Sequence, residues 1–251
     1  MADPARAGRG NFANRKIEAF LRRWLARSGA SRRLLELGCA RSIWLPYFAN
    51  TLGYAVTGMD YSPHGCEQTR EMLSVAGVQA DIVCADFFDP PEHLLHVFDA
   101  VFSYGVAEHF EDTSACIANF SRYLAPGGLI VTLIPNVNGL PGFLQKHLNR
   151  EVFDKHVPLT KDELECAHRY ASLKVESSGY LVSSHFGVLN LEGLPANAPG
   201  LRVKKAVLKS LCRFSMVAGL IDEHVRPLPL VGDFAAYVYC VARKPEWGQG
   251  E

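Results

Sequence analysis

Five short apolar segments, each ending in small or polar residues, recur through the first half of the chain. They span residues 33–39, 55–61, 81–86, 98–106 and 128–135. Runs of this length that are rich in Leu, Val, Ile and Phe are typical of strands buried on both faces. Helix signals lie between them, such as Ser62-Pro63 before a segment that Gly77 closes. The alternation predicts a doubly wound, mostly parallel α/β sheet, whose ligands bind beyond the carboxyl ends of the strands.

Length and charge limit what such a chain does. Its 251 residues, 48% of them hydrophobic, suit one domain better than two. We expect this domain over residues 14–245, after a flexible leader over 1–13 unlike a secretion signal and before a tail over 246–251. The 26 basic and 26 acidic side chains cancel, so no nucleic-acid partner is expected. No apolar run reaches the ~18 residues of a membrane span, which favours a soluble, cytoplasmic protein.

The seven cysteines stand singly, without a Cys-x-x-Cys pair or a His-rich neighbour. This spacing supports neither a disulfide framework nor a zinc site, and it favours buried free thiols in a reducing compartment. We therefore expect no bound metal. The pattern says nothing about the oligomeric state.

An amphipathic helix is predicted near the start of the chain. Residues 14–27 place apolar side chains three and four positions apart, with arginines on the other face. Phe20 and Trp24 are expected to pack on the sheet, whereas Phe12 precedes the periodic stretch and is a candidate for covering the site.

The second half of the chain is less regular. Thr160, followed by Glu163, forms a capping-box sequence that opens a helix. Two more strands are predicted over residues 182–191 and 234–243.

Two segments, residues 136–160 and 192–232, match no strand pattern and are expected to act as lids. The second contains a helix whose apolar and basic side chains lie on different faces. The apolar set is Val203, Val207, Leu211, Phe214 and Ala218, and the basic set is Arg202, Lys205, Lys209 and Arg213. We expect the apolar face to pack and the basic face to be solvated, with attachment to an anionic membrane as the alternative.

Acidic and small residues follow the first three predicted strands. Glu36 and Gly38 end the first, Asp60 ends the second, and Asp86 with Phe87 ends the third. The carboxyl ends of adjacent parallel strands meet at one edge of the sheet. There Gly38 would let a ligand approach the backbone, and Asp60 would accept from both hydroxyls of a ribose. Asp86 and Phe87 would contact adenine, so the sequence predicts an adenosine site.

With these residues the sequence resembles the class I S-adenosylmethionine-dependent methyltransferases, and it looks closest to the ubiquinone-biosynthesis-like, small-molecule branch. The resemblance covers residues 34–136 and includes the segments 98–110 and 124–128. It implies a Rossmann-like, seven-stranded sheet with an antiparallel last strand over 234–243. It also implies S-adenosyl-L-methionine as cofactor and a small-molecule methyl acceptor.

The resemblance assigns roles to single residues as well. It implies a cofactor site made of Glu36, Gly38, Cys39, Ala40, Asp60, Tyr61, Asp86, Phe87, Tyr104 and Gly105. Glu36 and Gly38 would surround the methionine part, and Asp60 would hold the ribose. Tyr61 would cover the adenine face opposite Phe87. Tyr104 and Gly105 would lie beneath the sulfonium.

The sequence departs from the family pattern Glu-x-Gly-x-Gly-x-Gly at two positions. Ala40 and Ser42 replace the second and third glycines. Ala40 allows a close approach if its φ is negative, whereas a left-handed conformation there would cost about 1 kcal/mol or more.

Methyl transfer is a direct displacement, and a general base helps when the acceptor is a phenol or an amine. Histidine suits this task because it titrates near neutral pH. His109 follows the fourth strand, His156 lies in the first lid segment, and Glu108 could accept a proton or orient an amine. Each also has a plain interpretation: a structural hydrogen bond for His109, and surface positions for His156 and Glu108.

Two other functions remain open. A nicotinamide-dependent oxidoreductase needs Gly-x-Gly-x-x-Gly, but Gly38, Ala40 and Ile43 stand at those positions. A non-catalytic binding or regulatory protein could keep the fold and lose the glycines.

Overall fold

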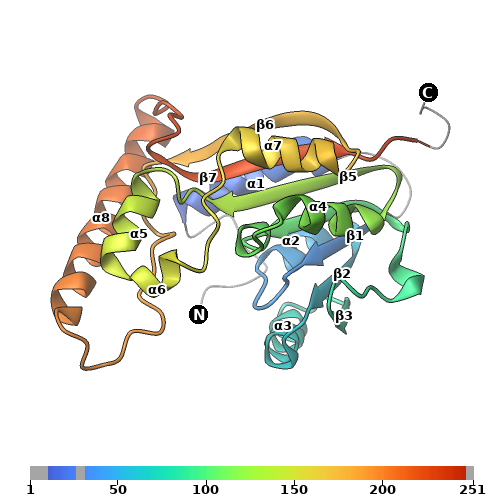
Figure 1. Cartoon of the computed structure of the whole chain (residues 1–251), viewed down its shortest axis with the longest axis horizontal. Coiled ribbons are helices and arrows are strands. Elements are labelled where there is room, and N and C mark those ends of the chain that lie inside the picture. Colours follow the sequence, from blue (N-terminus) through green and yellow to red (C-terminus); the bar gives the residue numbers. More distant parts are fainter. Residues whose placement is uncertain (1–10, 27–31, 247–251) are drawn as a thin grey trace.

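The computed structural model describes residues 11–26 and 32–246, and a seven-stranded sheet runs through it (Figure 1). The strands are β1 (Arg32–Leu37), β2 (Tyr54–Asp60), β3 (Asp81–Cys84), β4 (Phe98–Tyr104), β5 (Leu124–Pro135), β6 (Lys174–Ser183) and β7 (Ala235–Arg243). Residues 1–10 and 247–251, where most of the leader and tail are expected, lie outside the described residues.

The strand order is β3-β2-β1-β4-β5-β7-β6. β1 pairs in parallel with β2 and β4, and β7 runs antiparallel to both β5 and β6. The expected sheet, mostly parallel with an antiparallel last strand, is confirmed. The carboxyl ends of β1 to β5 therefore share one edge, and the site is to be sought there.

Helices cover both faces because successive strand residues point to opposite sides. Leu34 faces the side with α1, α2 and α3, and Leu35 faces the side with α4 and α7; both leucines are fully buried. The helices are α1 (Phe12–Leu25), α2 (Trp44–Asn50), α3 (Pro63–Val75), α4 (Thr113–Arg122), α5 (Leu140–Leu148), α6 (Arg150–Phe153), α7 (Lys161–Tyr170) and α8 (Leu201–His224). Short 3-10 helices are η2 (Glu92–Leu94) and η3 (Ala107–His109). No helix in these described ranges is both long and apolar enough to cross a bilayer.

Side-chain caps fix where several helices begin. Ser62 accepts from the backbone N–H of Gly65 at the start of α3, as the Ser-Pro sequence predicts. The capping box of Thr160 and Glu163 opens α7 and is confirmed. Asn11 caps α1, which begins at Phe12 and so reaches into the stretch expected to be a leader.

The strand predicted over residues 182–191 is misplaced. The chain pairs earlier, as β6 over Lys174–Ser183, and turns away after Ser183. β6 is an edge strand of mainly exposed or partly buried residues, with only Val182 and Ser183 buried at its end, so it lacks the apolar run that marks the inner strands.

The helix in the second lid segment forms, but only part of its predicted apolar face packs. Ala218 is buried and Leu211 contacts the small cluster around Phe186, whereas Val203 is 66% exposed and Phe214 is 56% exposed. The other buried residues of α8 are Leu201, Ser215 and Gly219. Helical spacing identified a stripe of apolar side chains without showing which stripe meets the protein. α5, α6 and α8 stand together at the end of the sheet toward which the β5 arrow points (Figure 1).

Candidate functional site

A cavity of about 950 Å³ opens at the carboxyl ends of the first four strands. Among the residues that line it are Glu36, Gly38, Ala40, Asp60, Tyr61, Asp86, Phe87, Tyr104 and Gly105, all expected from the sequence to bind the cofactor. Cys39 is the exception, because its side chain is fully buried and it does not line the cavity.

The turn after β1 brings backbone close to this cavity. Gly38 has a φ of +73°, and a Cβ at this position would lie 2.3 Å from Cγ2 of Val106. Its backbone N–H donates to the carbonyl of Met59 at 2.8 Å, which holds the turn against β2. Glycine is needed here for conformation and for space.

Ala40 fits the loop without strain. The left-handed residue is its neighbour Arg41, with a φ of 55°, and Ala40 is not among the residues with positive φ. The methyl group of Ala40 faces the first turn of α3, where a Cβ on Gly65 would lie 2.8 Å from it. Gly65 thus leaves the space for the methyl group that Ala40 carries in place of the glycine of the family pattern.

Ser42 ties the loop to a buried carboxyl group. Its hydroxyl donates to Glu36 Oε2 at 2.6 Å and accepts from the backbone N–H groups of Trp44 and Leu45 at the start of α2. Burial raises the pKa of Glu36 to about 8, against the lowering effect of the Ser42 hydrogen bond. The serine in place of the third glycine therefore has a defined structural role.

The carboxylate of Asp60 is held by two backbone groups. Oδ2 accepts from Ala40 N–H at 3.0 Å and Oδ1 accepts from Ser62 N–H at 2.9 Å. The side chain is buried at the end of β2 yet lines the cavity. Each oxygen keeps a lone pair for a further donor, as two ribose hydroxyls would require.

Aromatic residues form the other wall. Phe87 is 9% exposed and packs edge-on against Phe110 and Phe120, with ring centroids 5.3 and 5.0 Å apart. Asp86 accepts from the backbone N–H of Phe88 at 2.9 Å. Tyr61 is 79% exposed at the rim, so its ring is free to cover a flat ligand.

A second cavity of about 360 Å³ adjoins the first. Tyr104, Gly105 and His109 line both cavities, whereas Glu108 and His156 line only the second. The Tyr104 hydroxyl donates to the hydroxyl of Tyr237 at 2.9 Å, which fixes the ring between the two spaces.

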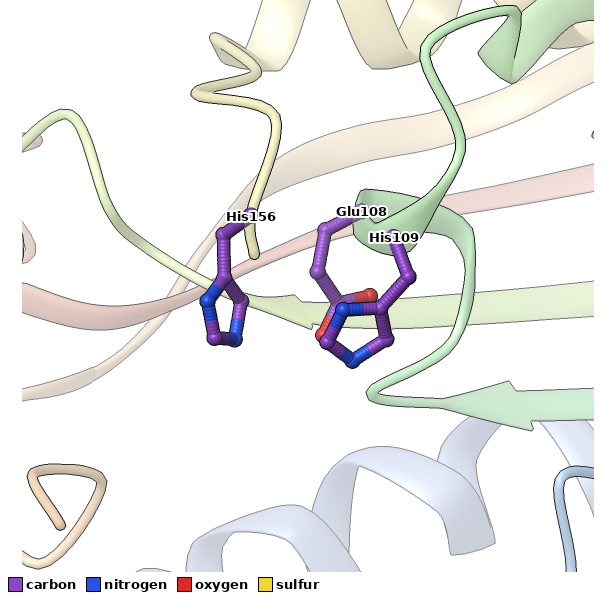
Figure 2. A group of neighbouring side chains, drawn as sticks. All are labelled: Glu108, His109 and His156. Atoms are coloured by element: carbon purple, nitrogen blue, oxygen red, sulfur yellow. The ribbon is translucent and has the colours of Figure 1, made fainter. Parts of the chain in front are cut away.

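Glu108, His109 and His156 come together on the wall of the second cavity (Figure 2). The His109 and His156 ring centroids lie 4.8 Å apart. Nδ1 of His109 lies 3.0 Å from the carbonyl oxygen of Lys155, and Nδ1 of His156 lies 2.6 Å from that of Val152. Carbonyl oxygens only accept, so each Nδ1 carries the proton when the ring is neutral, and each Nε2 is free.

Burial distinguishes these three residues. Glu108 is 1% exposed, and burial raises its pKa to about 8. His156 is half-buried, which lowers its pKa. The surface positions that the sequence left open for Glu108 and His156 do not hold.

Several lining residues were not found from the sequence. They are Arg41, Ser42, Ile43, Trp44, Phe88, Val106 and Phe110. Arg41 could have been found, because it lies between Ala40 and Ser42 within the Glu-x-Gly-x-Gly-x-Gly segment. Phe110 belongs to a segment that the resemblance included, but its aromatic contacts depend on tertiary packing.

The charges of the cavity favour a ligand with donors and positive charge. Glu36, Asp60 and Asp86 line it, with Arg41 as the one Lys or Arg side chain in its described lining. A dinucleotide would place its diphosphate among these carboxylates, whereas a sulfonium, an ammonium group and ribose hydroxyls suit them. The acidic lining of the cavity therefore fits S-adenosylmethionine and disfavours NAD.

Residues 35–132 match the family described as "Methyltransferase domain". This segment is thus similar to known methyltransferase domains. The domain match takes in β1 to β4 and most of β5, and so includes the strand ends that form the cavity.

Two curated relatives of the chain are named for RNA modification. The chain is 30% identical over 113 residues to the tRNA U34 carboxymethyltransferase of Cellvibrio japonicus (strain Ueda107), over 44% of this chain and 35% of that protein. It is 28% identical over 158 residues to the ribosomal RNA large subunit methyltransferase E of Desulfatibacillum aliphaticivorans, over 56% and 71%. The chain thus spans about a third of the length of the first relative.

The fold extends beyond the matched segment. The geranyl diphosphate C-methyltransferase from Streptomyces coelicolor A3(2), crystallised with Mg²⁺, geranyl-S-thiolodiphosphate and S-adenosyl-L-homocysteine, superimposes with a TM-score of 0.62. The superposition covers 92% of this chain and 76% of that chain at 16% identity. This likeness shows a common fold for the matched segment and the segments that flank it.

Proposed function

We propose that this chain transfers the methyl group of S-adenosyl-L-methionine to an oxygen or nitrogen atom of a small molecule. The observation that carries the proposal is the carboxylate-rich cavity at the strand ends of a segment that is similar to methyltransferase domains. The second cavity, which shares a wall with the first, supports a small acceptor.

S-adenosyl-L-methionine would supply an electrophilic methyl group on a positively charged sulfur. In this proposal Glu36 and the turn at Gly38 hold the methionine part, and Asp60 accepts from the ribose hydroxyls. Asp86 and Phe87 frame the adenine, and Tyr61 covers its other face. Tyr104 and Gly105 line both cavities, which supports a place for them beneath the reacting centre.

The acceptor would lie in the second cavity, beside Glu108, His109 and His156. His109 is the first candidate for the general base, because it lines both cavities and its Nε2 is free. His156 also presents a free Nε2, and burial lowers its pKa, which keeps the ring neutral and able to accept a proton. The buried carboxyl group of Glu108 orients an amine or stabilises a protonated histidine.

Calorimetry tests the cofactor. Titration with S-adenosyl-L-methionine should give micromolar binding, and NAD should give none. Binding to neither compound by the folded protein would favour a non-catalytic role, and binding to NAD alone would reject the proposal.

The acceptor is tested by a screen of phenols, amines, carboxylic acids and RNA, with methylated products detected by mass. Small-molecule methylation is the expected result. Because two relatives are named for RNA modification, methylation of RNA alone would overturn the small-molecule part of the proposal.

With an acceptor in hand, His109→Ala should leave cofactor affinity unchanged and lower kcat by about 10²-fold or more, as loss of a general base does. His147→Ala is the matched control, because His147 is an exposed histidine whose Nδ1 also contacts a backbone carbonyl, that of Phe143. Full turnover by His109→Ala would reduce His109 to a structural role.

A further inference from the structure

Three side chains with metal-binding atoms converge from two separate segments. Glu108 and His109 belong to η3, and His156 follows α6. One ligand atom from each lies within 4.8 Å of the others. Figure 2 shows the two rings and the carboxyl group beside one another. We propose that Glu108, His109 and His156 bind a divalent transition-metal ion of the zinc class. No metal was expected from the sequence, because the scattered cysteines showed no metal-binding spacing.

The two histidines are oriented as metal ligands are. A ligating histidine usually donates its other ring N–H to a carbonyl or carboxylate, which fixes the tautomer and the ring. Nδ1 of His109 contacts the carbonyl of Lys155, and Nδ1 of His156 contacts that of Val152. Both Nε2 atoms are therefore left with a lone pair for a cation.

Glu108 provides an independent observation. Its Oε2 is buried and finds no hydrogen-bond partner among the described residues. Its Oε1 lies 4.0 Å from Nε2 of His109. A buried carboxyl oxygen without a partner is costly, and a bound cation would supply the missing interaction.

The backbone holds the two segments together at this point. The carbonyl of Glu108 accepts from the N–H of Val157 at 2.6 Å, and the carbonyl of Lys155 faces Nδ1 of His109 at 3.0 Å. These two contacts lie on either side of His156, so its ring is held opposite η3. A preformed set of ligands lowers the ordering cost of binding an ion.

The separations allow coordination after a small movement. Zinc–nitrogen distances of about 2.0–2.1 Å in a tetrahedron place ligand atoms about 3.3 Å apart. The His109 side chain is 42% exposed, so a small shift of its ring together with the turn that carries Lys155 would close the remaining ångström or more. Two imidazoles and one carboxylate leave a coordination position open, as catalytic zinc sites do.

The open position would face the second cavity, which all three residues line. An oxygen atom of the acceptor could bind there, and its hydroxyl would lose a proton more readily beside the ion. With the ion bound, Nε2 of His109 and of His156 would be ligands, and the ion would take over the activation of the acceptor assigned above to the metal-free histidines. This role in holding an oxygen acceptor rests on the proposed methyl transfer, whereas metal binding does not.

Metal content tests the site directly. The full chain is treated with EDTA, dialysed against Zn²⁺, and its bound zinc is measured by mass spectrometry. Co²⁺ serves as a second probe, because its absorption spectrum reports the coordination. The wild type should bind one ion more than His156→Ala, and His147→Ala should bind as much as the wild type. Glu108→Gln should lower the affinity of this ion at least about tenfold.

Equal metal content in the wild type and His156→Ala overturns the proposal. Because Glu108 is buried, thermal melting checks that Glu108→Gln folds, and His109→Ala provides a second ligand variant at a more exposed position. Cofactor affinity is measured on the same samples. If the protein binds the cofactor but no metal, the metal site is rejected and the proposed function stands. If it binds the metal but no cofactor, the metal site stands and the proposed function is rejected.

Discussion

At the scale of single residues, Asp60 connects the loop after β1 to the end of β2. Its two oxygens accept from the backbone N–H groups of Ala40 and Ser62. The same carboxylate faces the cavity at the position where a ribose is proposed. It therefore orders the loop before any ligand arrives.

Asp60→Ala should weaken the binding of S-adenosyl-L-methionine more than tenfold, because charge-assisted hydrogen bonds contribute about 1.5–3 kcal/mol each. Calorimetry measures the change. Asp81→Ala is the control, since Asp81 is an exposed aspartate at the start of β3 that does not line the cavity. Unchanged affinity in Asp60→Ala would remove this residue from the site.

Glu36 links burial to pH. Its pKa is about 8 in the folded protein, whereas an unfolded Glu ionises near its ordinary value of 4.5. Between these values the unfolded chain releases a proton that the folded chain keeps, so the free energy of unfolding falls as pH rises and levels off above about pH 8.

Glu36→Gln removes this pH dependence. Without cofactor, its stability relative to the wild type should rise by at least about 1 kcal/mol between pH 5 and pH 8.5, because one pKa unit corresponds to about 1.4 kcal/mol. Urea unfolding at the two pH values measures it. Hydrogen bonds from Thr160 lower the pKa of Glu163, so Glu163→Gln should show no such gain.

At the scale of elements, the loop after β1 and the first turn of α3 fit each other. Ala40 carries a methyl group where the family pattern has glycine, and Gly65 leaves the space that this methyl group needs. The two positions should therefore be coupled in energy, although each alone looks like a minor change.

Gly65→Ala should destabilise the protein by about 1–3 kcal/mol, because the new methyl group meets that of Ala40. In an Ala40→Gly background the same change should be neutral or stabilising, since alanine is the better helix former. A double-mutant cycle by urea unfolding measures the coupling. If the two substitutions change the free energy of unfolding additively, the loop after β1 moves to make room for the new methyl group and the two positions are not coupled.

At the scale of the whole molecule, α8 is joined to the sheet domain mainly through α1 and the segment after β6. Arg15 forms a bidentate ion pair with Glu223, and Lys16 pairs with Asp222. Leu208 and Leu211 contact the small cluster around Phe186. Much of the remaining surface of α8 is exposed and apolar, so this helix is expected to open more readily than the sheet.

Glu223→Gln should speed hydrogen exchange of the α8 amides about two- to fivefold, as the loss of a partly exposed ion pair allows. The amides of β1, β4 and β5 should keep their rates and serve as the internal control. Equal acceleration in the sheet would mean that α8 is part of the main cooperative unit.

The inner strands and most of the lining of the larger cavity could be predicted, because the residues at or near the ends of the buried strands line it, as Glu36 and Asp60 do. Contacts between distant segments could not. Nothing in the sequence placed His156 beside Glu108, and periodicity did not reveal that Val203 faces solvent. The sequence likewise did not show that Arg41, and not Ala40, is the left-handed residue of the loop.

The position of β7 has a consequence for biosynthesis. β7 lies between β5 and β6, although it follows both in the chain. As a ribosome releases the protein, β6 and the adjoining α7 have no place in the sheet until β7 has been made. Nascent chains that end before residue 235 should therefore leave the edge of β5 open to chaperones or to other chains.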